Sequence, residues 1–351
     1  MQTAHGSGTI KKTNYITRFG ACCRERKTDM GITKNKQTNE NIIRMAKAAF
    51  PERGIPKIEE LTEGMCNAAY RLTYMDGFKT ILKISSPIKE GFMTNETNLM
   101  EAEVRAMKLV AENTPIKVPE VYKYDTSKEL CDGDYFFMEN LDGTSWVSVA
   151  DRLGETVNAG LRMEVGKLQK QLSEVKGDKF GLVGDDVHRF ESLYDFTYFL
   201  IKNVLEDAEK RNVVIGVSKE EILTELGKDR ELFDKIEKPV LVHWDMWEGN
   251  IFVKDNHVSG IIDWERAMWG EPLMDDRFRN HNRHADFLKG FGISELSDEE
   301  LRRVHWYDIL LYLTMMTEVT YREYEEDSQY QWVKPMFDKI WEGELHAKAK
   351  E

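Results

Sequence analysis

The amino-acid sequence predicts an α+β protein with two lobes, a small β-rich lobe followed by a larger, mostly helical lobe. Short runs with strand-like patterning are concentrated before residue 140, whereas helical periodicity dominates after residue 144. The chain has 351 residues, about two to three times the length of a typical single domain. Hydrophobic residues make up 41% of the chain, which is enough to bury a substantial core.

The chain divides into four segments. Residues 1–37 are rich in polar and basic residues and lack sustained periodicity, which indicates a flexible N-terminal extension. Met30 is an alternative start within it, and an ordered arm is the alternative interpretation. We assign residues 38–139 to the N-terminal lobe, residues 140–143 to a hinge, and residues 144–351 to the C-terminal lobe. A cleft between two such lobes is a natural ligand site.

Local patterning supports each element of the N-terminal lobe. Apolar residues repeat with helical spacing from Asn39 to Phe50 and again over about 95–112, and Pro51 ends the first helix. Met75-Asp76-Gly77 is a hairpin turn signal between two strand-like runs. The predicted strands cover residues 70–74, 80–84, 118–124 and 135–138.

The C-terminal lobe is predicted to be helical apart from one group of short strands. Ser218 with Glu221, and Ser297 with Glu300, have the spacing of a capping box before apolar-periodic segments. The predicted strands cover residues 240–242, 251–253 and 260–262, and they flank polar loops. We therefore expect a helical lobe that presents two loops on a small β insert.

Composition excludes several classes of protein. The 49 Lys and Arg residues against 62 Asp and Glu give a formal charge of -13, which argues against nonspecific binding of nucleic acid or of an anionic membrane. No apolar run is long enough to span a bilayer, and the N-terminus lacks the apolar core of a signal peptide. The four cysteines form neither a disulfide nor a zinc pattern. We expect a cytoplasmic protein; the sequence does not indicate its oligomeric state.

The polar loops carry the residue types that phosphoryl transfer requires. Asp245 and Asn250 lie on one loop and Asp263 follows the next apolar run. One carboxylate is needed to orient the attacking hydroxyl, and an oxygen-rich set is needed to hold Mg²⁺ against the phosphates. The alternative is a polar loop whose Asp and Asn side chains cap turns.

These motifs resemble those of the aminoglycoside phosphotransferase and choline kinase-like family, relatives of the protein kinases. The resemblance is carried by VHWDMWEGNIFV at 242–253 and GIIDWERAMWGEPLMD at 260–275. It implies a protein-kinase-like fold and an ATP- and Mg²⁺-dependent kinase, with Asp245 as catalytic base and Asn250 and Asp263 as Mg²⁺ ligands. It also implies that His243 supports the loop through hydrogen bonds and that Asp275 braces the metal loop.

The resemblance assigns nucleotide-binding residues to the N-terminal lobe and the hinge. Lys83 would bind the α/β-phosphates, and Glu103 would tether its ammonium. Glu101 is the rival tether. The alternative for Lys83 is an edge-strand lysine whose ammonium reaches solvent. A covering turn would be formed by Gly64 and Asn67. In the hinge, Met138 would line the adenine pocket, with the carbonyl of Glu139 and the N–H of Leu141 contacting the base; a plain linker is the alternative.

The acceptor is expected to be a small molecule with a hydroxyl group. Trp244 stands where protein kinases usually carry Arg, and the short stretch from Asp263 to Gly270 leaves little room for a peptide-docking segment. A cationic aminoglycoside-type sugar and a choline- or ethanolamine-type amino alcohol both fit the acidic composition, as do other metabolites. A nucleotide-binding pseudokinase is the further alternative. We interpret the acidic residues of 318–327 as a solvated helix face.

Overall fold

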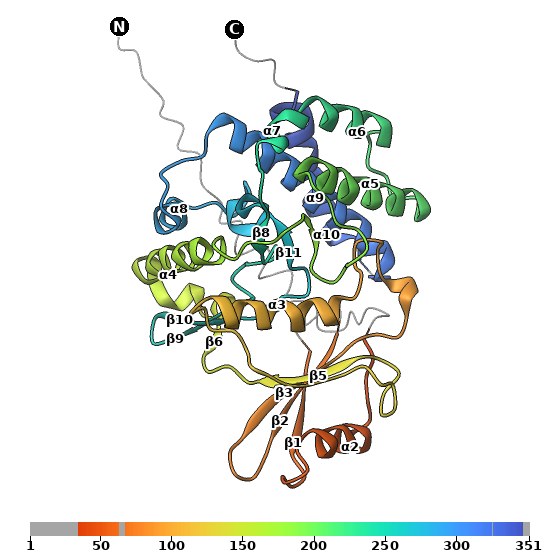
Figure 1. The fold of residues 1–351 in the computed structure, drawn as a ribbon, viewed down its shortest axis with the longest axis vertical. Coiled ribbons are helices and arrows are strands. Elements are labelled where there is room, and N and C mark those ends of the chain that lie inside the picture. The colour runs from red at the N-terminus through yellow and green to blue at the C-terminus, as the bar shows by residue number, and fades with distance from the viewer. Residues whose placement is uncertain (1–33, 63–66, 325, 347–351) are drawn as a thin grey trace, which may run out of the picture.

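The computed structural model describes residues 34–62, 67–324 and 326–346. It shows the predicted two-lobed α+β fold, with a β-rich N-terminal lobe and a helical C-terminal lobe (Figure 1). The residues 1–33 of the expected extension, and Gly64, lie outside the described residues. Asn35 and Gln37 contact the N-terminal lobe, since Asn35 Nδ2 donates to the Ser85 carbonyl at 3.0 Å and the Gln37 N–H donates to the Tyr70 hydroxyl at 3.0 Å.

The N-terminal lobe is built on a five-stranded antiparallel sheet in the order β1-β2-β3-β5-β4. The predicted hairpin at residues 75–77 joins β2 to β3, and Gly77 has the positive φ of 87° that such a turn favours. The strands are β1 (Lys57–Leu61), β2 (Ala68–Thr73), β3 (Lys79–Ile84), β4 (Val121–Asp125) and β5 (Tyr135–Glu139). β1 was not predicted, because its sequence KIEEL forms a polar edge strand without clear alternation.

The two faces of this sheet belong to different hydrophobic clusters. Helix α2 (Asn39–Ala49) packs on one face, with Leu82 and Phe137 in its cluster. Helix α3 (Leu99–Asn113) lies at the other face, where Ile81 and Phe136 join a cluster that continues into the C-terminal lobe. Successive residues of a strand point to opposite faces, so the strand that carries Lys83 is anchored in both cores.

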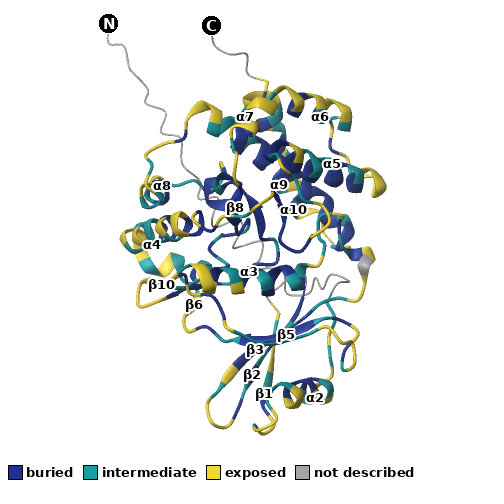
Figure 2. Ribbon diagram, in the orientation of Figure 1, coloured by how far each residue is buried: buried dark blue, intermediate teal, exposed yellow. Residues whose placement is uncertain are grey.

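The C-terminal lobe is mostly helical, and its centre is buried (Figure 2). Both predicted capping boxes are confirmed, at the starts of α6 and α9. The helices are α4 (Ala150–Leu172), α5 (Leu193–Lys210), α6 (Lys219–Lys228), α7 (Arg230–Asp234), α8 (Ala285–Phe291), α9 (Asp298–Tyr321) and α10 (Ser328–Asp338). Short helical turns cover Lys89–Gly91, Trp146–Ser148, Pro272–Met274, Asp276–Phe278 and Lys339–Glu344.

Two small sheets hold the polar loops of this lobe. One has the strand order β10-β9-β6 and the other β7-β11-β8. The strands are β6 (Thr144–Ser145), β7 (Gly181–Leu182), β8 (Val240–Val242), β9 (Ile251–Lys254), β10 (His257–Ile261) and β11 (Met268–Gly270). The strands predicted near 240, 251 and 260 are therefore confirmed, and they fix a 243–250 loop and a 262–267 loop.

The expectation of a solvated acidic helix face at residues 318–327 is only partly correct, since Glu323, Glu326 and Asp327 are exposed but Glu318 is not. Glu318, the first residue of the run interpreted as a solvated helix face, is only 6% exposed, and α9 ends three residues later at Tyr321. Arg266 of the 262–267 loop reaches this carboxylate and pairs with it.

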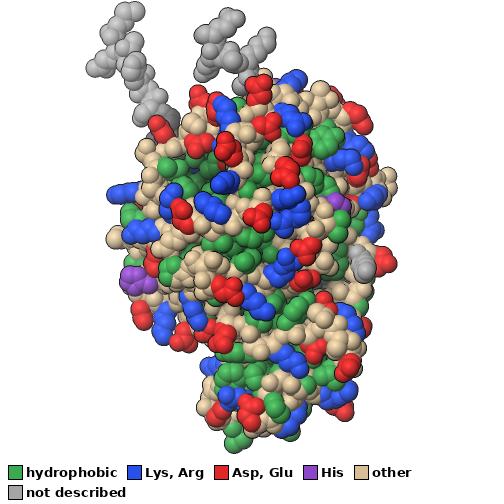
Figure 3. All heavy atoms as spheres, in the orientation of Figure 1, with side chains coloured by type: hydrophobic (Ala, Val, Ile, Leu, Met, Phe, Trp, Pro, Cys, Tyr) green, Lys and Arg blue, Asp and Glu red, His purple; other side chains and the backbone are tan. Residues whose placement is uncertain are grey.

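On the face seen in Figure 3, acidic and basic side chains are interspersed. Within the described ranges, no helix has the length and apolar character needed to cross a bilayer.

Candidate active site

The 243–250 loop begins in a strained conformation that its neighbours hold in place. Trp244 has a positive φ of 78°, which is unfavourable for a bulky residue. Its N–H donates to the buried carboxylate of Asp275 at 3.1 Å, and its ring lies 4.3 Å from the guanidinium of Arg279. Asp275 therefore braces the loop that contains Asp245, whereas the sequence interpretation placed it against the loop of Asp263.

His243 connects the two polar loops. Its Nε2 lies 2.9 Å from the Ile262 carbonyl, and its Nδ1 accepts from the Asp245 N–H at 3.3 Å. A carbonyl only accepts and a backbone N–H only donates, so the ring is the neutral tautomer with its proton on Nε2. Burial agrees with this, because it lowers the pKa of His243 to about 4. The ring thus holds the loops, as the sequence analysis expected.

Asn250 holds the side chain of Asp245. Its Nδ2 donates to the backbone carbonyl of Asp245 at 2.9 Å and to Asp245 Oδ2 at 3.2 Å. With this nitrogen directed at Asp245, the amide oxygen is the Asn250 atom suited to a cation. The Ile262 N–H donates to the Asn250 carbonyl at 3.0 Å, which fixes the spacing of the loops. Burial and the negative charge of Asp276 raise the pKa of Asp245 well above its ordinary value.

Lys83 lies between two carboxylates from opposite sides of the site. Its Nζ is 2.8 Å from both carboxylate oxygens of Glu103 on α3 and 2.8 Å from Asp263 Oδ1. Glu103 is fully buried, and the rival Glu101 instead lies 3.6 Å from Arg105. Burial opposes the charge on Lys83, but the two carboxylates prevail and raise its pKa, so the ammonium stays protonated.

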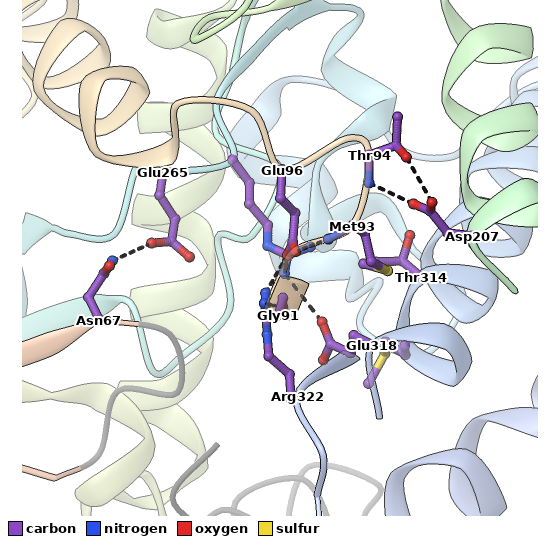
Figure 4. Close-up of polar contacts among 12 residues, drawn as sticks. Asn67, Gly91, Met93, Thr94, Glu96, Asp207, Glu265, Thr314, Glu318 and Arg322 are labelled. Atoms are coloured by element: carbon purple, nitrogen blue, oxygen red, sulfur yellow. Dashed lines mark hydrogen bonds and ion pairs between the residues drawn. The ribbon is translucent and has the colours of Figure 1, made fainter. Parts of the chain in front are cut away.

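A third carboxylate, Glu265, completes a cluster that is suited to a divalent cation. Oxygens of Glu103, Asp263 and Glu265 all lie within 4.8 Å of one another. Burial and the charge of Asp263 raise the pKa of Glu265. Asn67 Nδ2 donates to Glu265 at 2.8 Å (Figure 4). Burial also raises the pKa of Glu103 to about 8. The three carboxyl groups supply the hard oxygen ligands that Mg²⁺ prefers, so these residues fit the expected metal.

The hinge residues lie at and beyond the end of β5. Met138 is buried, and its carbonyl accepts from the Thr80 hydroxyl at 2.7 Å. The Glu139 N–H donates to the Glu120 carbonyl at 2.8 Å, and Leu141 is buried. The adenine contacts expected of Met138, Glu139 and Leu141 stay predictions.

The structure adds buried charged residues to which sequence reasoning gave no role. These residues are Glu265, Asp276 and Glu96. Asp276 in turn lies 3.2 Å from the ring of His281. For Asp276, the sequence signal was its position directly after Asp275. No local sequence pattern indicates a role for Glu96, because its partners are distant in the sequence.

A protein-family comparison identifies the class of protein that this fold and site define. The model of the Phosphotransferase enzyme family (APH) matches residues 57–275, more than half of the chain. The chain therefore belongs to this family and is a phosphotransferase. Comparison with curated proteins gave no match.

Solved structures of aminoglycoside phosphotransferases share the fold. APH(4)-Ia is 16% identical with a TM-score of 0.60, and the alignment covers 89% of this chain and 100% of that chain. A thermostable APH(4)-Ia mutant, in a ternary complex with AMP-PNP and hygromycin B, is 14% identical over 87% and 99% of the chains with a TM-score of 0.59. The streptomycin–ATP–APH(2")-IIa complex is 13% identical over 87% and 99%, with a TM-score of 0.57.

Proposed function

We propose that this phosphotransferase moves the γ-phosphoryl group of ATP to a hydroxyl of a small molecule. The observation that carries the proposal is the convergence of Lys83, Glu103 and Asp263, which the Ile262–Asn250 hydrogen bond joins to the loop of Asp245. An ammonium, a carboxylate cluster and a second carboxylate on a neighbouring loop are the parts that phosphoryl transfer uses. Solved members of the fold bind AMP-PNP or ATP, which supports a nucleotide here.

Each residue has a role that follows from its surroundings. Lys83 would bind the α/β-phosphates, and Glu103 holds its ammonium in place. Asp263 and Asn250, with Glu265 beside them, would hold Mg²⁺, which supplies charge neutralisation on the triphosphate when bound. Asp245 would accept the proton of the acceptor hydroxyl. Burial raises its pKa, which makes the carboxylate a stronger proton acceptor.

The hinge would recognise the base of the nucleotide. Glu139 is the last residue of β5, which pairs with the strand of Lys83, and Leu141 follows two residues later. The Glu139 carbonyl and the Leu141 N–H would contact the base, and Met138 would line the pocket beside them. Asn67 would cover the phosphates together with Gly64. Its hydrogen bond to Glu265 supports a position over the metal-binding carboxylates.

A small acceptor fits the structure better than a protein substrate. The segment after Asp263 turns at once into β11, which pairs with both β7 and β8. These residues are therefore used in a sheet and are not available to dock a peptide. Solved relatives contain hygromycin B or streptomycin, so we propose a cationic amino sugar as the acceptor.

A transfer screen tests the proposal. The protein is incubated with ATP labelled in its γ-phosphoryl group, with Mg²⁺ or with a chelator, and with amino sugars, amino alcohols or neutral alcohols. Labelled acceptor should form only with Mg²⁺, and most readily with an amino sugar. Nucleotide binding without transfer to any of the acceptors would favour a pseudokinase, and transfer to an amino alcohol alone would overturn the proposed acceptor class.

A further inference from the structure

The connection between β3 and α3 is anchored on the C-terminal lobe. In this connection, residues 85–98, Thr94 donates through its N–H and hydroxyl to the carboxylate of Asp207 on α5 at 2.6 and 2.7 Å (Figure 4). Asn95 Nδ2 donates to the Leu200 carbonyl of the same helix at 2.9 Å. These contacts tie residues 94 and 95 of the connection to α5 and do not reach the 262–267 loop.

Glu96 lies at the centre of a buried ion cluster in this connection. Its side chain is 3% exposed, and Oε1 accepts from Arg266 at 2.9 Å and from Arg322 at 2.6 Å. Oε2 accepts from the Met93 N–H at 2.9 Å. Glu318 provides Arg266 with a second carboxylate at 3.3 Å. Figure 4 shows Glu96 beside Arg322, with Glu318 reaching toward the same centre.

Glu96 lies just before one of the two elements that meet at Lys83 and contacts the other. Helix α3 begins three residues after Glu96 and carries Glu103, which holds the ammonium. Arg266 is three residues after Asp263, which holds the same ammonium from the opposite side. Lys83 is therefore connected to Glu96 on one side through Glu103 and α3, and on the other side through Asp263 and Arg266. Charge-assisted hydrogen bonds are strong and directional in a buried site.

We propose that Glu96 is a positioning residue for the nucleotide and metal site. It fixes the helix of Glu103 and the loop of Asp263 relative to each other, so that both carboxylates reach Lys83 before nucleotide arrives. Arg322, which is 1% exposed and also donates to the Gly91 carbonyl, ties this arrangement to the end of α9. The inference rests on the proposed function, because it concerns the same nucleotide site.

The test compares Glu96→Gln with a matched control, Asp207→Asn. Both acids are almost fully buried, with side chains 3% and 2% exposed, and both accept a backbone N–H of the same connection. Only Glu96 contacts the 262–267 loop. Binding of AMP-PNP is measured by calorimetry over a range of Mg²⁺ concentrations and without acceptor, together with the melting temperature of each protein.

The two variants should lose stability alike but differ in binding. Outer-shell partners of metal ligands are worth about 10–100-fold in affinity, so Glu96→Gln should weaken Mg²⁺-dependent AMP-PNP binding at least about tenfold, whereas Asp207→Asn should stay within about twofold of wild type. Equal binding by the two variants would overturn the inference. Failure of the wild-type protein to bind AMP-PNP would instead overturn the proposed function.

A second variant keeps the inference testable if Glu96→Gln does not fold. Arg266→Lys retains the charge but replaces a planar guanidinium, which reaches Glu96 and Glu318 together, with a single ammonium. It should raise the dissociation constant for AMP-PNP with Mg²⁺ by several fold, less than Glu96→Gln does. Wild-type affinity of Arg266→Lys in a folded protein would contradict the positioning role of this contact.

Discussion

Asp275→Asn should change how the stability of this protein depends on pH. Asp275 is fully buried, and its carboxylate accepts from the Trp244 N–H. Burial and the charge of Asp276 raise its pKa from 3.8 to about 7. The folded state therefore binds the proton more tightly than the unfolded state, so this group stabilises the fold at low pH and loses that contribution as pH rises from 3.8 through 7.

The magnitude follows from the two pKa values. As pH rises from 5, the wild-type protein loses stability until Asp275 ionises at its folded pKa of about 7. These two pH units correspond to a loss of about 2–3 kcal/mol by pH 8. Asn keeps an acceptor for Trp244 but does not titrate. The free energy of unfolding of Asp275→Asn, relative to wild type, should therefore rise by about 2–3 kcal/mol from pH 5 to pH 8.

Urea unfolding of both proteins at pH 5 and pH 8 measures this difference. The attraction of Arg277 and Arg279 for the Asp275 carboxylate is already contained in its pKa of about 7, so it needs no separate correction. If the wild-type and variant free energies change in parallel over this range, Asp275 does not have a raised pKa and the reasoning is wrong.

Two further predictions use matched variants. Glu103→Gln should lower the rate of phosphoryl transfer about 10–100-fold because it weakens the hold on the Lys83 ammonium. Glu101→Gln should leave the rate unchanged. Equal rates of the two variants would contradict the role of Glu103 as the tether of Lys83. Gly166→Ala should lower the free energy of unfolding in urea by about 1–3 kcal/mol, because its Cβ would lie 2.2 Å from the Phe287 carbonyl where α4 meets α8. Gly160→Ala, in the same helix with nothing within 4 Å of its Cβ, should be neutral or stabilising, and a loss as large as that of Gly166→Ala would refute the packing argument.

Local signals predicted much of the fold. The turn at residues 75–77 and the capping boxes at Ser218 and Ser297 act within a few residues, so the sequence shows them directly. The missed strands have weaker local signals. β1 is a polar edge strand, and β11 is a three-residue strand whose pairing with β7 and β8 is decided by packing between distant segments.

The part of the candidate site that lies in compact sequence motifs could be predicted. Asp245, Asn250 and Asp263 lie within 19 residues, and the structure brings them together with Lys83 and Glu103. Glu96 could not be found in this way. Its partners Arg266 and Arg322 are 170 and 226 residues away in the chain, and an isolated Glu before a helix resembles any solvated acid.

The rate of γ-phosphoryl transfer by Asp245→Asn, compared with Asp255→Asn, tests the central claim most directly. Asp255 is exposed, lies in the turn between β9 and β10 and has a positive φ that Asn tolerates, so its substitution should leave transfer unchanged. Asp245→Asn should bind AMP-PNP with Mg²⁺ normally but transfer the phosphoryl group about 10²–10⁴-fold more slowly. Transfer by Asp245→Asn at the rate of Asp255→Asn would contradict the assignment of Asp245 as the base.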